Sequence, residues 1–358
     1  MKVLFVNAGN ETGGGRSHII GLMKAMIALG KDEPSLLVFE DGPVAELARA
    51  NQLPVEVFEQ PKTLTPHFLK QLAAHINSEN IDVVHTHGPR SNLFLALIRK
   101  RITAKWTLTL HTLPKIDYLN KGFKGKILLP LSLWVLKKAD HIYLIAERFR
   151  NSLVQQGIDT NKMTTIFNAI EFSPEVPTPV KQPQFTMICV ARLTAQKHQQ
   201  LLLEALVNVD FEYQLHLIGD GELEAEFKKL ATDYQITDKV HFDGFQSDVA
   251  HFYRHTDLSV LSSIHEGFPT VLLESGNYGV PAITTDVGDS KVIVDSPEYG
   301  WVVDSLDLQG YVKALNEAYA AYQNNQLVGM GLAFNKHVSQ SFSTRQLAIL
   351  MHDLYAQL

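Results

Sequence analysis

Short apolar runs alternate with longer segments of helical periodicity along nearly the whole chain. The run KVLFVN at 2–7 precedes a helical pattern at 16–29, and IDVVHTH at 81–87 precedes another near 90–101. Neighbouring parallel strands cannot be joined by a tight turn, so they need a crossover segment, which is usually a helix. The alternation therefore predicts parallel sheets with helices on both faces, which is the α/β class.

A proline-rich segment, FSPEVPTPVKQPQ at 172–184, divides this alternation into two halves. Its four prolines cannot support a helix or a central strand, so we interpret it as a linker. The alternation restarts at 185–191, and the chain ends in helical segments. Open α/β sheets bind ligands beyond the carboxyl ends of their strands, so we expect a site there, facing a cleft between two domains.

Composition narrows the possible partners and locations. The chain has 358 residues and a net charge of −6, so we expect no nucleic-acid partner, and any anion must be held by a local cluster. The single cysteine, Cys189, excludes an intramolecular disulfide and fits a reducing compartment. The apolar run in MKVLFVNAGN is too short for a signal peptide, and no run approaches the ~20 residues that span a bilayer. We therefore expect a cytoplasmic protein.

The longest apolar run, ILLPLSLWVL at 127–136, has lysines on both sides. These are Lys121, Lys124, Lys126, Lys137 and Lys138. This pattern is typical of an interfacial membrane helix, but a buried helix with solvated lysine ends would share it. The first alternative would attach residues 121–138 peripherally to the inner face of the cytoplasmic membrane.

A glycine-rich loop, NAGNETGGGRSH at 7–18, follows the first predicted strand. Its glycines permit a close backbone approach to a ligand, and the next helix N-terminus favours an anion. The dinucleotide fingerprint GxGxxG is nearly present, with Gly13 and Gly15 in place but His18 at the sixth position, and Glu40 could mimic its ribose-binding acid. A loop that simply needs a flexible backbone is the alternative.

Histidines end two predicted strands, HTH at 85–87 and LH at 110–111. Strand alternation places His85 and His87 on one face. Two histidines could bind zinc, but no third ligand with a recognisable spacing follows. Alternatively, His87 or His111 could bond a sugar hydroxyl or act as an acid or base, although a lone histidine is more often structural.

Cations and glycines follow the strands of the second half. In VARLTAQKH, Arg192 and Lys197 lie five residues apart across a strand-to-helix turn, where they can converge on one phosphate. Two solvated surface cations would give the same pattern. Gly219, in LIGDGEL at 217–223, suits a backbone that passes close to a ligand.

Two glutamates occur in HEGFPTVLLESGNYGVP at 265–281. Pro269 suits a first helical position, and Gly279 suits a helix end, which predicts a helix at about 269–278. Glu274 then lies ~7.5 Å along the axis from a helix N-terminus that attracts anions, and Glu266 precedes the turn. A nucleoside diphosphate sugar fits all three features, with its ribose at Glu274 and its transferred sugar at Glu266.

The chain thereby resembles the retaining glycosyltransferases of family 4, which have the GT-B fold of two Rossmann-like domains facing a cleft. The motifs that carry the resemblance are GGGRSH, DVVHTH, TLHT, NAIEF, VARLTAQKH, LIGDGEL, HFDGF and HEGFPTVLLESGNYGVP. The resemblance implies an N-terminal acceptor-binding domain at 1–172 and a C-terminal nucleotide-sugar-binding domain at 184–338. It also implies a final helix at 339–358 that returns to the first domain.

The resemblance also implies roles for individual residues. Arg192 and Lys197 would hold the diphosphate, Glu274 the ribose and Glu266 the sugar hydroxyls. His111 would lie near the reacting carbon, on the acceptor side with His87. The remaining donor-binding residues would be Gly14, Gly219, Gly267, Phe268, Pro269, Thr270 and Val271. No cofactor and no divalent metal would be required.

Three departures from the family pattern bear on the donor sugar. The chain has Ser275 where the family often has alanine, Asp289 after Gly288 where it often has a second glycine, and Val292 where it often has an acid. Such positions lie near the donor sugar and phosphates in GT-B folds. They leave the identity of the donor more open than the type of reaction.

We therefore expect retaining transfer of a hexose-type sugar to a hydroxyl acceptor, a glycan or lipid-linked precursor of envelope polysaccharide or lipopolysaccharide. A GT-B nucleotide-sugar epimerase or phosphorylase is the alternative. A retaining glycosidase would leave Arg192 and Lys197 without a task. The missing sixth glycine argues against a nicotinamide oxidoreductase, and the full set of charged residues argues against a non-catalytic binding protein.

Overall fold

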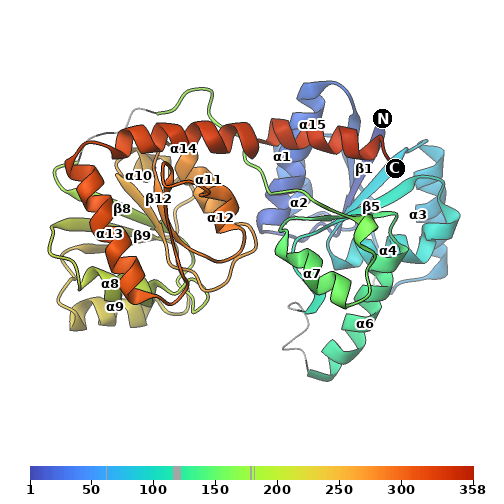
Figure 1. Ribbon diagram of the computed structural model, residues 1–358. Coiled ribbons are helices and arrows are strands. Elements are labelled where there is room, and N and C mark those ends of the chain that lie inside the picture. Colours follow the sequence, from blue (N-terminus) through green and yellow to red (C-terminus); the bar gives the residue numbers. More distant parts are fainter. Residues whose placement is uncertain (62, 116–121, 178–179, 181) are drawn as a thin grey trace. The chain divides into compact units, whose positions relative to one another are not determined.

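The computed structural model describes residues 1–358 except 62, 116–121, 178–179 and 181. The chain divides into two compact units (Figure 1). Unit 1 comprises Met1–Glu171 and Thr344–Leu358, and unit 2 comprises Phe172–Ser343. The proline-rich segment therefore belongs to unit 2, and the segment that returns to unit 1 begins at Thr344 rather than at 339.

Unit 1 is built on a parallel sheet of order β3-β2-β1-β4-β5-β6-β7. Its strands are β1 (Lys2–Asn7), β2 (Glu33–Val38), β3 (Val55–Val57), β4 (Val83–His87), β5 (Lys105–Leu110), β6 (His141–Leu144) and β7 (Met163–Thr165). Its helices are α1 (Gly14–Leu29), α2 (Pro43–Ala50), α3 (Pro66–Ser78), α4 (Pro89–Ile98), α6 (Gly122–Lys138), α7 (Arg148–Gln155) and α15 (Thr344–Tyr355). Two single turns, η1 (Arg99–Arg101) and η2 (Thr160–Lys162), also belong to unit 1.

Unit 2 repeats the plan with a parallel sheet of order β10-β9-β8-β11-β12-β13. Its strands are β8 (Phe185–Val190), β9 (Tyr213–Ile218), β10 (Val240–Gly244), β11 (Leu258–Leu261), β12 (Ala282–Thr285) and β13 (Gly300–Val303). Its helices are α8 (Gln199–Leu206), α9 (Glu224–Asp233), α10 (Ala250–Arg254), α11 (Thr270–Asn277), α12 (Ser290–Ile293), α13 (Leu308–Gln323) and α14 (Leu327–Ser341). The predicted α/β class is confirmed.

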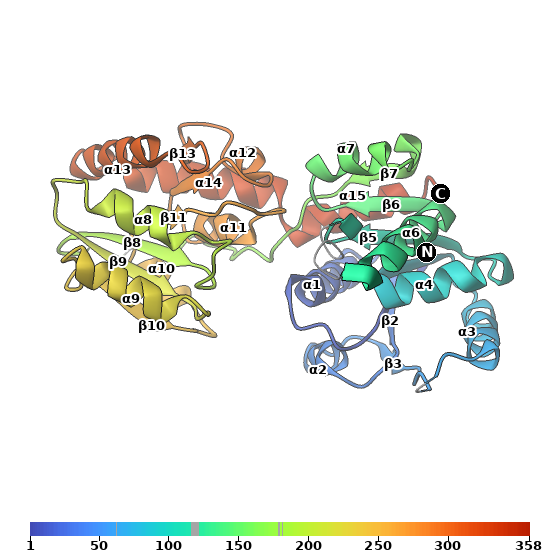
Figure 2. The same ribbon diagram turned by 90° about the horizontal axis from the view of Figure 1, so that it is seen from below.

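The period-two pattern of the first strand explains why helices cover both faces of its sheet. Val3 and Phe5 belong to the core formed with α1, α2 and α15, whereas Leu4 and Val6 belong to the core formed with α3, α4, α6 and α7. Figure 2 shows these layers in each unit. A strand that is buried on both faces must be apolar at nearly every position, as KVLFVN is.

Each sheet reverses its strand order at one place, between β1 and β4 in unit 1 and between β8 and β11 in unit 2. The loops that follow two such strands diverge to opposite faces of the sheet and leave room for a ligand between them. In unit 1 these loops begin at Asn7 and His87, and in unit 2 they carry Arg192 and Glu266. The predicted site residues therefore lie mainly around the two switch points.

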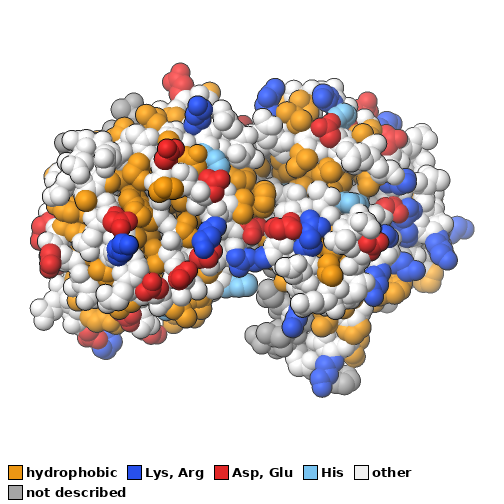
Figure 3. All heavy atoms as spheres, in the orientation of Figure 1, with side chains coloured by type: hydrophobic (Ala, Val, Ile, Leu, Met, Phe, Trp, Pro, Cys, Tyr) orange, Lys and Arg blue, Asp and Glu red, His pale blue; other side chains and the backbone are white. Residues whose placement is uncertain are grey.

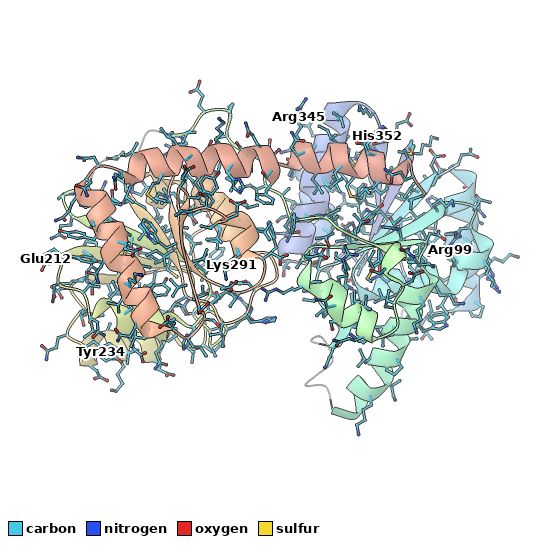
Figure 4. The ribbon with its side chains drawn as sticks, in the orientation of Figure 1. Arg99, Glu212, Tyr234, Lys291, Arg345 and His352 are labelled. Carbon is cyan, nitrogen blue, oxygen red and sulfur yellow. The ribbon has the colours of Figure 1, made fainter. Side chains whose placement is uncertain are left out.

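Helix α15 is fixed to unit 1 by polar contacts as well as by its apolar face. The Tyr355 hydroxyl and His85 Nδ1 are 2.6 Å apart, and His352 Nδ1 lies 2.9 Å from a carboxylate oxygen of Asp32. Asp32 is buried and also accepts a hydrogen bond from the amino group of Met1. Figure 4 labels His352 on this helix.

Helix α6 covers the 127–136 run, whose attachment to a membrane surface stays a prediction. It buries Val135 and Leu136 against unit 1, but it exposes Ile127, Leu131 and Trp134 to solvent. Lys121 lies outside the described residues. No helix in the described part of the chain is long and apolar enough to cross a membrane.

Candidate active site

The central contact at the unit 2 switch point is a salt bridge between Lys197 and Glu266. The Lys197 Nζ atom lies 2.5 Å from Glu266 Oε1, and Ser263 Oγ donates to the same oxygen at 2.7 Å. Glu266 is buried, with 8% of its surface exposed. The structure thus joins two predicted site residues that are 69 positions apart, and the predicted convergence of Lys197 with Arg192 on a phosphate stays a prediction.

Arg192 follows β8 and is exposed. Among the described residues, no carboxylate pairs with its guanidinium, whereas its carbonyl oxygen accepts a bond from Gln199 Nε2 at 2.9 Å. A guanidinium that is held at a fixed backbone position but has no internal partner can bind a phosphate bidentately.

Helix α11 begins at Thr270, one residue later than predicted, because Pro269 is its N-cap with an extended ψ of 94°. No side chain caps the helix, and Leu272 N–H already donates to the Pro269 carbonyl. The N–H groups of Thr270 and Val271 are the remaining donors of the first turn, which no intrahelical carbonyl can satisfy. An anionic group can therefore bind at this end of α11.

Of the predicted turn residues, Phe268 has a structural side chain. Its ring is buried and packs edge-to-face against Phe342, with centroids 5.4 Å apart. Gly267 accepts a hydrogen bond from Asp289 N–H at 2.9 Å, and Gly288 has a φ of +61°. A Cβ at Gly288 would lie 2.4 Å from the Gly267 carbonyl oxygen, so Gly288 must be glycine for the turn to keep its shape.

Glu274 lies one helical turn inside α11 and is largely buried. Burial raises the pKa of its carboxyl group to about 7. No salt bridge or hydrogen bond from the described residues reaches this carboxylate, so nothing in unit 2 offsets its desolvation. A carboxyl group that is desolvated without a compensating partner is typical of a ligand site, where hydroxyl donors of the ligand can complete its hydrogen bonds.

The backbone conformation and packing at position 219 require glycine, which the sequence alone did not predict. Its φ is +140°, and a Cβ there would lie 2.2 Å from the Ala191 carbonyl oxygen. Gly221 approaches Leu193 equally closely. These glycines let the β9 loop pack against the loop that carries Arg192, and the predicted role of Gly219 in donor binding remains a prediction.

The switch point of unit 1 carries three buried histidines, His18, His85 and His87, and the partly buried His111. The rings of His85 and His87 lie side by side on β4, with centroids 4.4 Å apart, as strand alternation predicted. His87 Nδ1 lies 3.1 Å from His111 Nε2, and the His18 ring packs edge-to-face on His111. The sequence had placed His18 only as a mismatch in a glycine motif.

These histidines are neutral at physiological pH. Burial lowers the pKa of His111 to about 3 and that of His18 to about 4, and it lowers the pKa of His85 and His87 far below their usual value. His85 bonds Tyr355 and Thr109, which makes it structural. Neutral His87 and His111 can donate or accept hydrogen bonds, but they carry no charge to hold a phosphate.

A cavity of about 500 Å³ opens beside these histidines. Its polar wall includes Asn7, Glu11, Asn92, His87 and His111, and its apolar wall includes Leu128, Leu131, Val135 and Leu136 of α6. The cavity thus brings together the two predicted acceptor-side histidines. Among the described residues, no three His, Cys, Asp or Glu side chains could jointly hold a metal ion.

The glycines of the loop at 7–18 differ in whether the packing of unit 1 requires them. Gly14 is the first residue of α1, and a Cβ at Gly13 or Gly14 would meet nothing within 4 Å, so packing in unit 1 does not require these glycines. A Cβ at Gly15 would lie only 2.0 Å from a carboxylate oxygen of Glu11. Glu11, Asn7 and Asn92 line this cavity and were not predicted as site residues from the sequence.

Two doubly wound parallel sheets, each with ligand-binding groups at its switch point, define the GT-B class of glycosyltransferases. Residues 12–173 match the model of Glycosyltransferase Family 4, and residues 174–327 match that of Glycosyl transferases group 1. The two matches together span most of the chain. The chain belongs to this glycosyltransferase family, which confirms the resemblance found in its motifs.

Curated relatives share only part of their length with the chain. It is 32% identical over 146 residues to the lipopolysaccharide core biosynthesis glycosyltransferase LpsE of Rhizobium meliloti, covering 41% of this chain and 42% of that protein. It is 27% identical over 190 residues to the lipopolysaccharide 1,6-galactosyltransferase of Escherichia coli, covering 51% and 53%. The chain therefore spans about half the length of these relatives.

Among solved structures, HepE of Anabaena in complex with UDP matches with a TM-score of 0.82 at 19% identity, covering 100% of both chains. The same protein has also been solved with UDP-glucose. At this level of identity the likeness shows the GT-B fold alone.

Proposed function

We propose that this protein is a retaining glycosyltransferase that moves a hexose from a nucleoside diphosphate sugar to a hydroxyl acceptor. One observation carries the proposal: the desolvated Glu274 carboxylate lies one turn inside a helix whose first N–H groups have no acceptor among the described residues. An anion binds at such an N-terminus, and a hydroxyl donor binds at the carboxylate. A nucleoside diphosphate has both groups at about this spacing.

In this proposal unit 2 binds the donor. The diphosphate accepts from Thr270 and Val271 N–H and from Arg192, while the ribose hydroxyls donate to Glu274. Lys197 is shared between Glu266 and a phosphate oxygen, since an ammonium group has three donors. Glu266, which is fixed by Lys197 and Ser263, accepts from the hydroxyls of the transferred sugar.

Unit 1 binds the acceptor in the cavity beside His87 and His111. The acceptor oxygen forms a bond to the anomeric carbon on the face from which the diphosphate leaves, as the carbon–oxygen bond to phosphate breaks. The acceptor proton passes to the departing phosphate oxygen, so the products are the glycoside and a nucleoside diphosphate. Arg192, Lys197 and the α11 N-terminus stabilise the leaving charge, which removes the need for a divalent metal.

The relatives suggest substrates. HepE binds UDP and UDP-glucose, and two curated relatives are named for lipopolysaccharide synthesis. We therefore propose a uridine diphosphate hexose as donor and a precursor of envelope polysaccharide or lipopolysaccharide as acceptor.

A thermal-shift screen of nucleotide sugars, followed by measurement of nucleotide release, tests the donor assignment. A ligand that binds only the native state raises the melting temperature. We expect UDP-hexoses to raise it for the parent protein but not for Arg192→Ala, while the exposed control Lys313→Met keeps the shift. Undiminished nucleotide release in the presence of EDTA supports metal independence. Product formation without any acceptor would instead indicate an epimerase, and a requirement for inorganic phosphate would indicate a phosphorylase.

We also propose that α6 attaches the protein peripherally to an anionic membrane surface. Ile127, Leu131 and Trp134 follow at i, i+4 and i+7, so they share one exposed stripe of the helix. Lys126, Lys137 and Lys138 are exposed around it, and Figure 3 shows basic and hydrophobic side chains together on α6. Apolar insertion and attraction to anionic headgroups then act together.

Vesicle co-sedimentation tests this surface. We expect binding to vesicles that contain phosphatidylglycerol, weaker binding to phosphatidylcholine vesicles, and loss of binding in Trp134→Ser and in Lys126→Glu. The matched control is Val154→Ser, because Val154 is an exposed apolar residue of α7 outside the stripe. Absence of binding by the parent protein, or equal loss in the control, would contradict the proposal.

A further inference from the structure

Glu11 lies in the loop between β1 and α1 and lines the cavity of unit 1. Its Oε2 accepts a hydrogen bond from Asn7 Nδ2 at 2.9 Å. Asn7 is itself fully buried, and its amide is fixed from both ends: Gly9 N–H donates to Oδ1 at 2.8 Å, and Nδ2 also donates to the His87 carbonyl at 3.2 Å. The Asn7 amide, which donates to Glu11, therefore has a single orientation that satisfies all three hydrogen bonds.

Gly15 completes the support of this carboxylate. The backbone of Gly15 is helical and its φ is not positive, so its conformation does not require glycine. A Cβ at this position would nevertheless lie 2.0 Å from Glu11 Oε1 and 2.7 Å from its Cδ. Glycine at 15 is thus explained by the space that the Glu11 carboxylate occupies.

Burial raises the pKa of Glu11, and the Asn7 hydrogen bond and Arg16 only partly oppose it. No described cation forms a salt bridge with Glu11, and its Oε1 accepts no hydrogen bond from the part of the chain that the structure describes. A partly desolvated acceptor atom is therefore held at the cavity wall without an internal donor, where it keeps contact with solvent and is available to a hydroxyl donor of a ligand.

Two other polar atoms in residues of the same wall have no internal partner. Asn92 Oδ1 and His87 Nε2 are buried and form no hydrogen bond within the described structure. Asn92 presents a second acceptor, and the neutral His87 can donate or accept. Two hydrogen-bond acceptors on one wall favour a ligand with several hydroxyl donors. The negative charge of the Glu11 carboxylate disfavours a phosphate or carboxylate group there, because like charges repel.

We propose that Glu11, together with Asn92, binds hydroxyl groups of an uncharged sugar unit of the acceptor and so determines which acceptor is used. The inference rests on the proposed function, since it assumes that unit 1 binds the acceptor. Glu11 is an acceptor-binding residue, while Asn7 and Gly15 are positioning residues that act through it.

The test compares two surrogate acceptors, methyl β-D-galactoside and methyl β-D-glucuronide, with UDP-glucose as donor and UDP release as the readout. The parent protein should use the neutral galactoside in preference to the anionic glucuronide. Glu11→Gln should raise the KM for the galactoside roughly tenfold or more, as expected when a hydrogen bond to a charged group is lost. Glu11→Gln should also reduce the preference of the protein for the neutral galactoside over the anionic glucuronide. A purely structural role of Glu11 would not change this preference.

Gly15→Ala provides a second variant that keeps every polar group. Alanine is the better helix former, so the fold should be at least as stable, yet the new Cβ must displace the Glu11 carboxylate. It should reproduce the effect of Glu11→Gln on KM. The matched controls are Glu33→Gln, at an exposed glutamate of unit 1, and Gly329→Ala, where a Cβ meets nothing within 4 Å.

The outcomes separate this inference from the proposed function. If the parent protein releases no UDP from UDP-glucose under any condition and binds no nucleotide sugar, the proposed function fails. If it hydrolyses UDP-glucose but neither glycoside raises the rate, or if Glu11→Gln keeps the parent KM and preference, the assignment of Glu11 is overturned.

Discussion

Replacement of Glu274 by glutamine should change stability and nucleotide affinity in opposite directions. Burial raises the pKa of Glu274 from 4.5 to about 7, so the native state holds the proton more tightly than the unfolded state does. Stability is therefore lost as the pH rises from about 4.5 to about 7, and it stays reduced above that. Glutamine has the same shape but never ionises, so it removes this penalty.

The magnitude follows from the shift in pKa. A difference of about 2.5 pKa units corresponds to a ceiling of ~3.4 kcal/mol at ~1.36 kcal/mol per unit. Because Glu274 keeps some contact with solvent, we expect Glu274→Gln to raise the free energy of unfolding by about 1–2 kcal/mol at pH 8. The gain at pH 5 should be much smaller, since the native carboxyl group is then protonated and the unfolded one only partly ionised.

Urea unfolding at pH 5 and pH 8, combined with calorimetric titration of UDP, measures both effects. At pH 8 the variant should be more stable but should bind UDP roughly tenfold more weakly, because the ribose loses a charged hydrogen-bond acceptor. Glu298→Gln, at an exposed glutamate of unit 2, should change neither property. A variant that is no more stable than this control at pH 8, or equally stabilised at both pH values, would refute the argument from burial.

Three further predictions concern contacts in the two units. Lys197→Met should destabilise the protein by about 3 kcal/mol in urea unfolding because it leaves the buried Glu266 charge without its partner, and adding Glu266→Gln should recover part of the loss. Gly288→Ala should cost at least ~2 kcal/mol, since the residue has a positive φ and contacts the neighbouring turn, whereas Gly329→Ala should stay within about 0.5 kcal/mol of the parent. Tyr355→Phe should cost about 1–2 kcal/mol by leaving the buried nitrogen of His85 unpaired, and hydrogen exchange should show faster opening of α15 than in the parent.

Much of the fold was predictable because its strands are buried on both faces and are therefore apolar along their length. The strand β13, GWVV, was not predicted, although it is as long as β6, β11 and β12, which were. The start of α11 was one residue wrong because Pro269 can cap a helix as well as begin one. Local patterns fix the type of an element better than its boundary.

The candidate site was predictable where a single loop or helix carries the information. The placement of Glu274 within its helix could be derived from 265–281 alone. The contact of Lys197 with Glu266 could not, since it depends on how β8 and β11 pair in space. The position of Glu11 at the cavity wall could not be predicted either, because it depends on the Asn7 amide and on the absent side chain of Gly15, and neither forms a motif.

The division of unit 1 into two chain segments has a consequence for folding during synthesis. Its last helix, α15, covers a core with Leu347, Ala348, Met351 and Tyr355, but the ribosome makes all of Phe172–Ser343 first. At about 5–20 residues per second, that interval lasts roughly 10–30 s. Unit 2 is continuous and can complete its fold in this time, while one face of the unit 1 sheet lacks its cover. The nascent chain is therefore open to aggregation and to chaperone binding on the α1 face until α15 emerges.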